Sequence, residues 1–127
     1  MAIKFNVIKR GEPGVTGGGA KKFYASAITD GETNIDGLTR NIEKISTVSG
    51  ADIRAVLYAL VDVMTAEMAE GRIVRLGDLG NMRVSISSRG ETAAPDVTAN
   101  SITNSRILFA PGPRLRDMLK TLQFRKA

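Results

Sequence analysis

The segment at residues 71–84, with the sequence GRIVRLGDLGNMRV, combines glycine turns with short apolar runs. Gly71 stands where a helix ends in a left-handed C-cap, a position that favours glycine. The next residues, IVRL, are typical of a short strand, and Gly77 and Gly80 flank a tight reversal. Apolar and polar side chains then alternate from Met82 to Ser87, as in a second strand. The segment therefore predicts a passage from a helix into an antiparallel sheet.

Two helices are predicted ahead of this segment. Thr33 and Asp36, and again Ser49 and Asp52, have the spacing of a capping box at a helix start. Apolar residues recur behind each box at helical spacing, and the second helix runs for about five turns. The two apolar stripes consist of Ile35, Leu38, Ile42 and Ile45, and of Ile53, Val56, Leu57, Leu60, Val61, Met64 and Met68.

These stripes hold more apolar surface than a short chain can cover by itself. A helix hairpin and three strands form a thin layer, so a second copy packed across the same stripes is the simplest way to bury them. The sequence therefore predicts a homodimer.

The N-terminal residues predict a separate pair of strands. Ile3, Phe5 and Val7 alternate with polar residues, as in a half-buried strand, and residues 22–29 are its expected partner. The connection GEPGVTGGGA lacks the Gly-Lys-Ser/Thr ending of a P-loop, and no helix is predicted directly after it. We therefore interpret it as a flexible loop and not as a phosphate-binding one.

The composition excludes most kinds of enzyme site. The 127 residues suit one compact domain with an appendage, and the absence of Cys and His removes thiolate chemistry, zinc fingers and imidazole catalysis. The carboxylates of Asp52, Asp62, Glu67 and Glu70 lie along helix faces without a third ligand. We expect no enzyme activity, no metal, no cofactor and no small-molecule substrate.

The expected location is the cytoplasm. No apolar run approaches the roughly 20 residues that span a bilayer, and the N-terminal sequence MAIKFNVIKRGE lacks a secretory signal. A chain without cysteine also fits an intracellular compartment. We therefore expect no membrane partner.

The charge is unevenly distributed along the chain. Residues 1–71 hold 8 Lys/Arg against 9 Asp/Glu, a net charge of −1, whereas residues 72–127 hold 10 against 4, a net charge of +6. A basic half is typical of a protein that binds a polyanion, because each neutralised phosphate releases counterions. The alternative from charge alone is a basic surface that is merely solvated.

Residues 34–122 resemble the HU and integration-host-factor type of bacterial histone-like proteins. The resemblance rests on the order of elements and on two motifs. The first is LGDLG, which is similar to the family's LxGFG turn, with Leu79 in place of an aromatic residue. The second is RILFAPGPRLRDMLKTL, which matches the family's aromatic residue, proline-glycine pair and closing helix. Residues 1–33 look like the extension of a longer HU-related branch in Bacteroides-like bacteria. We expect residues 1–33 to form a β extension and residues 34–127 an HU-like domain.

The resemblance implies an α+β fold and an architectural function. The expected fold is a helix hairpin, a three-stranded antiparallel sheet with a β-ribbon arm at about residues 87–106, and a C-terminal helix, preceded by a two-stranded extension, all in an intertwined homodimer. The implied function is to bind and bend double-stranded DNA in the nucleoid without sequence specificity.

The residues that the resemblance assigns to DNA lie in the second strand and the arm. Pro95, near the arm tip, corresponds to the apolar wedge that unstacks a base step, although a proline there could simply stiffen a turn. The other positions correspond to phosphate contacts in the sheet or at the arm roots. The complete set is Arg83, Ser85, Ser87, Arg89, Pro95 and Arg106.

The sequence departs from the family in the charge of these positions. Ser85 and Ser87 stand where basic residues are frequent, and the arm sets Arg89 against Glu91 and Asp96. Fewer cations predict weaker binding or an arm that is disordered until a partner orders it. The alternative function is therefore an HU-like dimeric scaffold that binds proteins and has weak or lost DNA binding.

Overall fold

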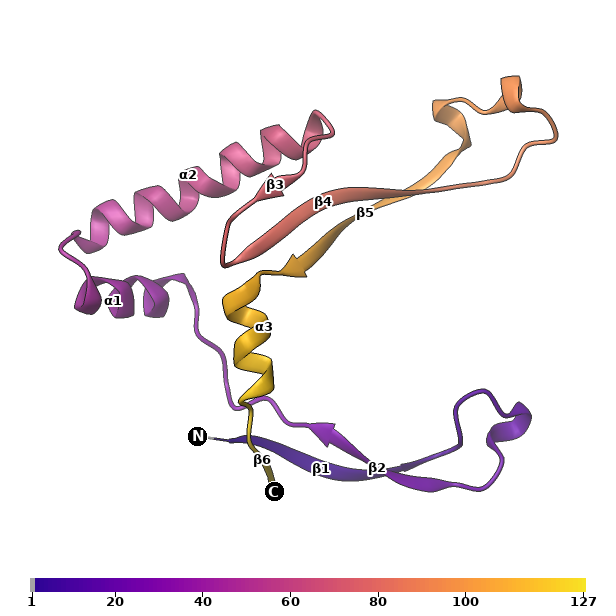
Figure 1. The fold of residues 1–127 in the computed structure, drawn as a ribbon, viewed down its shortest axis with the longest axis horizontal. Helices are drawn as coiled ribbons and strands as arrows, with labels where there is room; N and C mark the ends of the chain where they lie inside the picture. The colour runs from indigo at the N-terminus through magenta and orange to yellow at the C-terminus, as the bar shows by residue number, and fades with distance from the viewer. Residues whose placement is uncertain (1) are drawn as a thin grey trace. The chain divides into compact units, whose positions relative to one another are not determined.

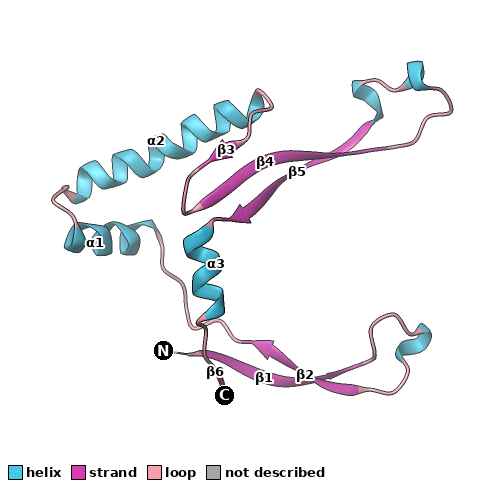
Figure 2. Ribbon diagram, viewed as in Figure 1, coloured by secondary structure: helices cyan, strands magenta, loops and turns pink. Residues whose placement is uncertain are grey.

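The computed structural model describes residues 2–127 and divides into two compact units. The central unit comprises Ile35–Met118. The terminal unit comprises Met1–Asn34 together with Leu119–Ala127, so it contains both ends of the chain (Figure 1). Helices and strands together form a mixed α+β fold with a three-stranded sheet in each unit (Figure 2).

The central unit begins with the predicted helix hairpin. Helix α1 spans Ile35–Ile45 and helix α2 spans Gly50–Ala69. Ser49 is the N-cap of α2, and its hydroxyl accepts a hydrogen bond from the backbone N–H of Asp52 at 3.3 Å. The connection is tightened by Glu43, whose Oε2 accepts from the N–H of Gly50 at 2.6 Å. These local hydrogen bonds explain why the second helix starts where the sequence predicts it.

The end of α2 and the following turn depend on glycine. Gly71 adopts a φ of 81° and its N–H donates to the carbonyl of Met68 at 3.0 Å, which closes the helix as predicted. Gly80 has a φ of 142°, and a Cβ there would meet the carbonyl oxygen of Ala110 and the ring of Phe109. Only glycine therefore fits the end of the LGDLG turn.

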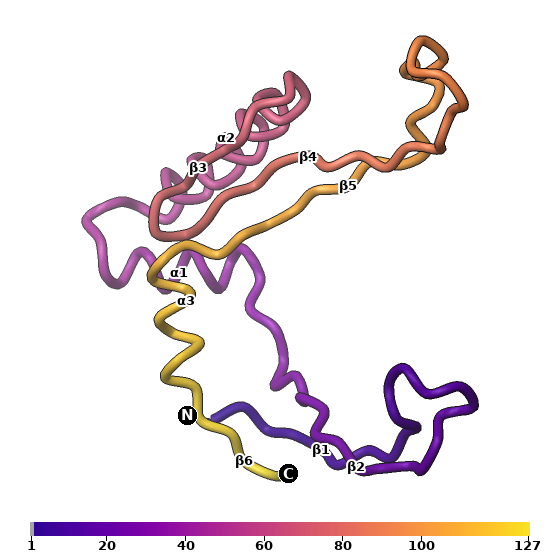
Figure 3. The backbone as a smooth tube through the Cα atoms, turned by 45° about the vertical axis from the view of Figure 1, so that its right-hand side comes forward, coloured from indigo at the N-terminus to yellow at the C-terminus, as the bar shows by residue number. Residues whose placement is uncertain are grey.

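The sheet of the central unit has the order β3-β4-β5. Strand β3 is Val74–Arg75, β4 is Gly80–Ser88 and β5 is Ile102–Pro111, and both pairings are antiparallel. Strands β4 and β5 continue beyond β3 as a two-stranded ribbon with a folded tip, which Figures 1 and 3 both show. This ribbon is the arm that the sequence predicts.

The two motifs that carry the family resemblance lie next to each other. The N–H of Gly112, in the FAPG motif, donates to the carbonyl of Leu79 in the LGDLG turn at 3.0 Å. The carbonyl of Gly112 then accepts from Arg116 at 3.0 Å at the start of helix α3, Pro113–Lys120. The turn that ends β3 therefore also fixes where the last helix begins.

The terminal unit contains a strand that the sequence analysis did not predict. Strand β1, Ile3–Arg10, pairs antiparallel with β2, Lys22–Ala27, and parallel with β6, Phe124–Lys126. The N-terminal extension is therefore three-stranded instead of two-stranded, and its third strand comes from the C-terminal residues that were assigned to the HU-like part. Three residues are too few for a period-two pattern to be visible in a sequence.

A single chain has almost no hydrophobic core. Among the described residues, Ile53 is the one hydrophobic side chain that is buried, with 6% of its surface exposed. Large apolar side chains such as Val56, Val61 and Ile107 have more than half of their surface exposed. Much apolar surface therefore remains open to solvent.

The strained position of Gly80 leads to a stability prediction. We expect Gly80→Ala to lower the free energy of unfolding by more than about 1 kcal/mol, because the new methyl group meets the backbone of Ala110 at an unfavourable φ. Urea denaturation followed by circular dichroism measures the effect. Gly90→Ala is the matched control, since a Cβ at Gly90 meets no atom within 4 Å. Equal midpoints for both variants would contradict this explanation of the turn.

Candidate nucleic-acid interface

One face of the central sheet collects most of the polar residues that the sequence singled out. Directly paired residues in a sheet share a face, and neighbours along a strand alternate. Arg83 pairs with Leu108, Ser85 with Arg106, and Ser87 with Asn104. Arg83, Ser85, Ser87 and Arg106 thus lie on one face, which we call the polar face of the central sheet.

The opposite face of the same strands is apolar. Met82 pairs with Phe109, and Val84 pairs with Ile107. These apolar side chains are nevertheless partly open to solvent, and 60% of the Ile107 surface is exposed. The alternation predicted for residues 82–87 therefore separates a polar face from an apolar one, although one chain does not cover the apolar face completely.

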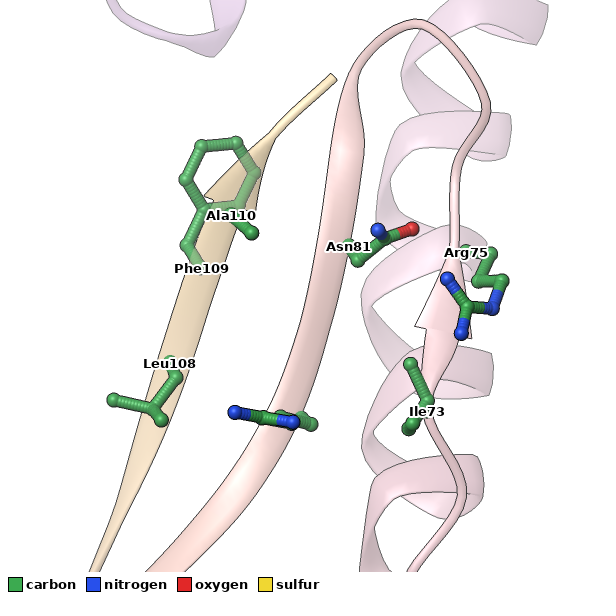
Figure 4. Close-up of a pocket in the computed structure, with 7 residues that line it drawn as sticks. Ile73, Arg75, Asn81, Leu108, Phe109 and Ala110 are labelled. Carbon is green, nitrogen blue, oxygen red and sulfur yellow. The ribbon is translucent and has the colours of Figure 1, made fainter.

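A shallow groove of about 430 Å³ lies on the polar face (Figure 4). Its polar lining comes from Arg75, Asn81 and Arg83, and its apolar lining includes Ile73 and Leu108. Arg75 on β3 pairs with Asn81 on β4, and Figure 4 shows their side chains beside each other. The groove therefore combines guanidinium groups with an amide.

Sequence reasoning missed Arg75 as a member of this face. The signal was present in the sequence, because Arg75 follows the apolar Val74 in a strand and alternation places it with the polar residues. A strand of two residues gave too short a pattern to single it out. With Arg75, the polar face carries three arginines, Arg75, Arg83 and Arg106.

The three arginines are available to an external anion. Within residues 2–127, none of them forms an ion pair with a carboxylate. A guanidinium group presents five N–H donors in a planar fork that matches the oxygens of a phosphate. Ser85, Ser87 and Asn104 add neutral donors along the same strands. The face is therefore chemically suited to contact a phosphate backbone.

Arg89 differs from the other predicted phosphate contacts. It follows the end of β4, and its Nε donates to Oε1 of Glu91 at 2.8 Å. The Arg89 side chain is exposed whereas that of Glu91 is half-buried, and the pair directs the guanidinium group toward a carboxylate within the arm. Arg89 is thus not equivalent to Arg83 or Arg106.

The arm tip is folded around one buried serine. Ser101 is completely buried, and its hydroxyl donates to Glu91 Oε1 at 3.0 Å and accepts from the N–H of Thr98 at 3.2 Å. Its carbonyl accepts from the N–H of Arg89 at 2.9 Å and the hydroxyl of Ser88 at 3.2 Å. These hydrogen bonds join Ser101 to Ser88, Arg89, Glu91 and Thr98 across the arm tip.

Pro95 lies in the short helical turn Ala94–Asp96 within this tip. The tip also presents Val97, of which 56% of the surface is exposed. Sequence reasoning located Pro95 correctly near the end of the arm but missed Ser101, because nothing in the pattern of a polar loop distinguishes a buried serine from an exposed one.

Among the described residues, no group of three or more acidic, His or Cys side chains could hold a metal ion. No helix there is long and apolar enough to cross a membrane.

Comparisons with known proteins agree on the fold. A comparison with curated protein sequences found no match. Among solved structures, a putative DNA-binding protein from Bacteroides vulgatus ATCC 8482 superposes with a TM-score of 0.69 at 12% identity; the match covers 98% of this chain and 48% of that chain. The present chain therefore spans about half the length of that protein. The HU protein of an Anabaena HU–DNA cocrystal structure superposes with a TM-score of 0.55 at 17% identity, over 70% of this chain and 99% of that chain.

A family model gives the strongest relationship. It describes an HU domain fused to a wHTH, Ig or glycine-rich motif, and it matches residues 1–126. The match includes the β1–β2 hairpin as well as the elements that resemble HU. The chain therefore belongs to the HU-HIG family.

Proposed function

We propose that this protein is an architectural DNA-binding protein that acts as a homodimer and binds duplexes without sequence specificity. The observation that carries the proposal is the polar face of the central sheet, where Arg75, Arg83 and Arg106 lie among serine and asparagine donors. The family match and the fold shared with an HU protein that was crystallised with DNA support it.

The chemistry of this face favours the phosphate backbone over the bases. Arginine, serine and asparagine all donate hydrogen bonds to phosphate oxygens, and such contacts position a protein without reading sequence. The face lies on a sheet, and no helix presents a comparable row of arginines for insertion into a major groove. Binding should therefore depend strongly on salt and weakly on base sequence.

Dimerisation is supported by the exposure of helix α2. The apolar residues of a helix are normally buried, yet Val56, Leu60, Val61 and Val63 of α2 are all exposed in the single chain. Val56, Leu60 and Val63 lie within about 60° of one another around the helix axis, so one packed surface could cover them. A second copy packed against α2 would bury this surface.

Bending follows from the arm and its tip. Two arms in a dimer would place two copies of Pro95 against one duplex, and an apolar wedge between base steps kinks DNA so that it contacts more protein. Pro95 lies in a short helical turn of the arm tip, where the backbone N–H of Asp96 donates to the carbonyl of Ala93 at 3.1 Å. A residue held in a turn loses little conformational freedom on insertion, which favours binding.

A protein-binding scaffold is the second candidate, and one observation favours it. Residues 90–105 contain Glu91 and Asp96 but no Lys or Arg, so the outer arm carries a net negative charge. An acidic arm repels phosphate and lowers DNA affinity. In this alternative, the exposed Val97 and the neutral ribbon contact another protein.

DNA binding is predicted to depend on Arg83 more than on Arg89. We expect Arg83→Gln to weaken binding to all duplex sequences alike and to flatten the salt dependence by about one logarithmic unit, because one phosphate contact is lost. Arg89→Gln is the matched control and should change the slope less, since Glu91 already engages Arg89. Fluorescence anisotropy of a labelled duplex at several salt concentrations measures both. Wild-type protein that fails to bind even at low salt would favour the scaffold.

The proposed homodimer predicts the mass of the protein in solution. Sedimentation equilibrium of the wild-type chain should give twice the monomer mass of 13.6 kDa, and the unfolding midpoint should rise with protein concentration. Leu60→Asp should remove the dimer, because it places a charge in the proposed interface. Thr47→Asp adds the same charge in the exposed connection between α1 and α2 and should leave the dimer intact. A folded wild-type monomer at micromolar concentration is incompatible with the proposed interface.

A further inference from the structure

The net positive charge of the chain is confined to the terminal unit. Its residues hold 8 Lys/Arg against 3 Asp/Glu, a net charge of +5, whereas the central unit holds 10 against 10 and is neutral. The C-terminal half of the sequence is basic, but the fold divides its cations between the two units. Arg125 and Lys126 lie in β6, and β6 pairs with β1 in the terminal unit. The HU-like body, which carries the proposed DNA-binding face, contributes none of the net charge.

The terminal sheet has two chemically different faces. Ile3 and Phe5 on β1 share one face with Phe124 on β6 and with Ala25 and Ala27 on β2, and these residues line an apolar hollow. The alternate residues form the opposite face, which we call the basic face. Its four cations are Lys4, Arg10, Lys22 and Arg125.

The cations of the basic face form two like-charge pairs across neighbouring strands. Lys4 pairs with Arg125, and Arg10 pairs with Lys22. Like charges that face each other across a sheet are destabilising. Glu12 relieves one pair by an ion pair with Lys22 at 2.8 Å, but in the described part of the chain no carboxylate pairs with Lys4 or Arg125. An external anion would neutralise this repulsion.

The spacing of the two pairs fits an extended polyanion better than a small anion. Lys4 and Arg10 are six residues apart on β1, which corresponds to about 20 Å along the strand. This length matches about six phosphate steps of 3.4 Å along a DNA strand. Asn6 and Ser26, which pair with each other on the same face, supply neutral donors between the charges.

Tyr24 holds one of these cations in place. It lies on the basic face between the two pairs, and the guanidinium carbon of Arg10 is 5.0 Å from the centre of its ring. A cation–π contact of this kind orients the guanidinium group without neutralising its charge. Arg10 therefore remains able to bind an anion.

We propose that the basic face of the terminal sheet is a second DNA-binding surface, separate from the polar face of the central sheet. The inference rests on the proposed function, since it takes duplex DNA as the polyanion. The basic face supplies phosphate contacts through Lys4, Arg10, Lys22 and Arg125, and it compensates for the neutral charge of the HU-like body. Its contacts are independent of base sequence.

The test removes one like-charge pair from the full-length protein. In K4Q/R125Q, the salt dependence of binding to a labelled 40-base-pair duplex should be flatter by about 1.8 logarithmic units, because two phosphate contacts are lost. Over a fourfold rise in salt, that corresponds to about 12-fold less loss of affinity than in the wild type. The matched control is K9Q/K126Q, which removes two charges from the opposite face of the same sheet and should change the slope by less than half as much.

A second readout separates binding from folding. Because K4Q/R125Q removes a repulsion, its urea midpoint should equal or exceed that of the wild type. Equal salt slopes for the wild type and K4Q/R125Q, or equal effects of the two double variants, would overturn the inference while leaving the proposed function intact. If the wild type does not bind DNA, both the proposed function and this inference are wrong. If Arg83→Gln leaves the salt slope unchanged while K4Q/R125Q lowers it, the polar face of the central sheet is rejected as the binding surface and the basic face of the terminal sheet is supported.

Discussion

The apolar surface that a single chain leaves exposed is the constraint on which the rest of the structure depends. Helix α2 carries a long apolar stripe, yet one buried hydrophobic residue, Ile53, is all that the described chain offers as a core. Burial of hydrophobic side chains is the main favourable contribution to folding. In the proposed homodimer, the second copy is therefore part of the folded state and not a later association. It would also duplicate the arm and the polar face.

The glycine turn at the end of β3 links this packing to the candidate interface. Gly80 allows the close approach of Ala110, and Gly112 joins the same turn by a hydrogen bond to Leu79. These contacts fix the register of β4 against β5, and the register decides which side chains share a face. A shift by one residue would move Arg83 and Ser85 to the apolar face. The polar face thus depends on backbone positions far from the arm.

The sequence predicted the elements whose signals are local and missed those that depend on distant pairing. Capping at Ser49 and the positive φ of Gly71 are encoded within a few residues, so α2 and its end were predictable. Strand β6 was not, because three residues gain their structure only by pairing with β1 at the other end of the chain. The same pairing places Arg125 in the terminal unit, so the charge counted by unit is distributed differently from the charge counted along the sequence. The burial of Ser101 likewise depends on Glu91 and Thr98, which no sequence pattern links to it.

In the proposed function, two chains act together on one duplex. Native mass spectrometry of the protein mixed with a 40-base-pair duplex at low salt counts the chains in each complex and so tests this proposal. We expect a dominant species with the mass of the duplex plus two chains of 13.6 kDa each. A dominant complex with one chain per duplex, or no complex at all, would contradict it.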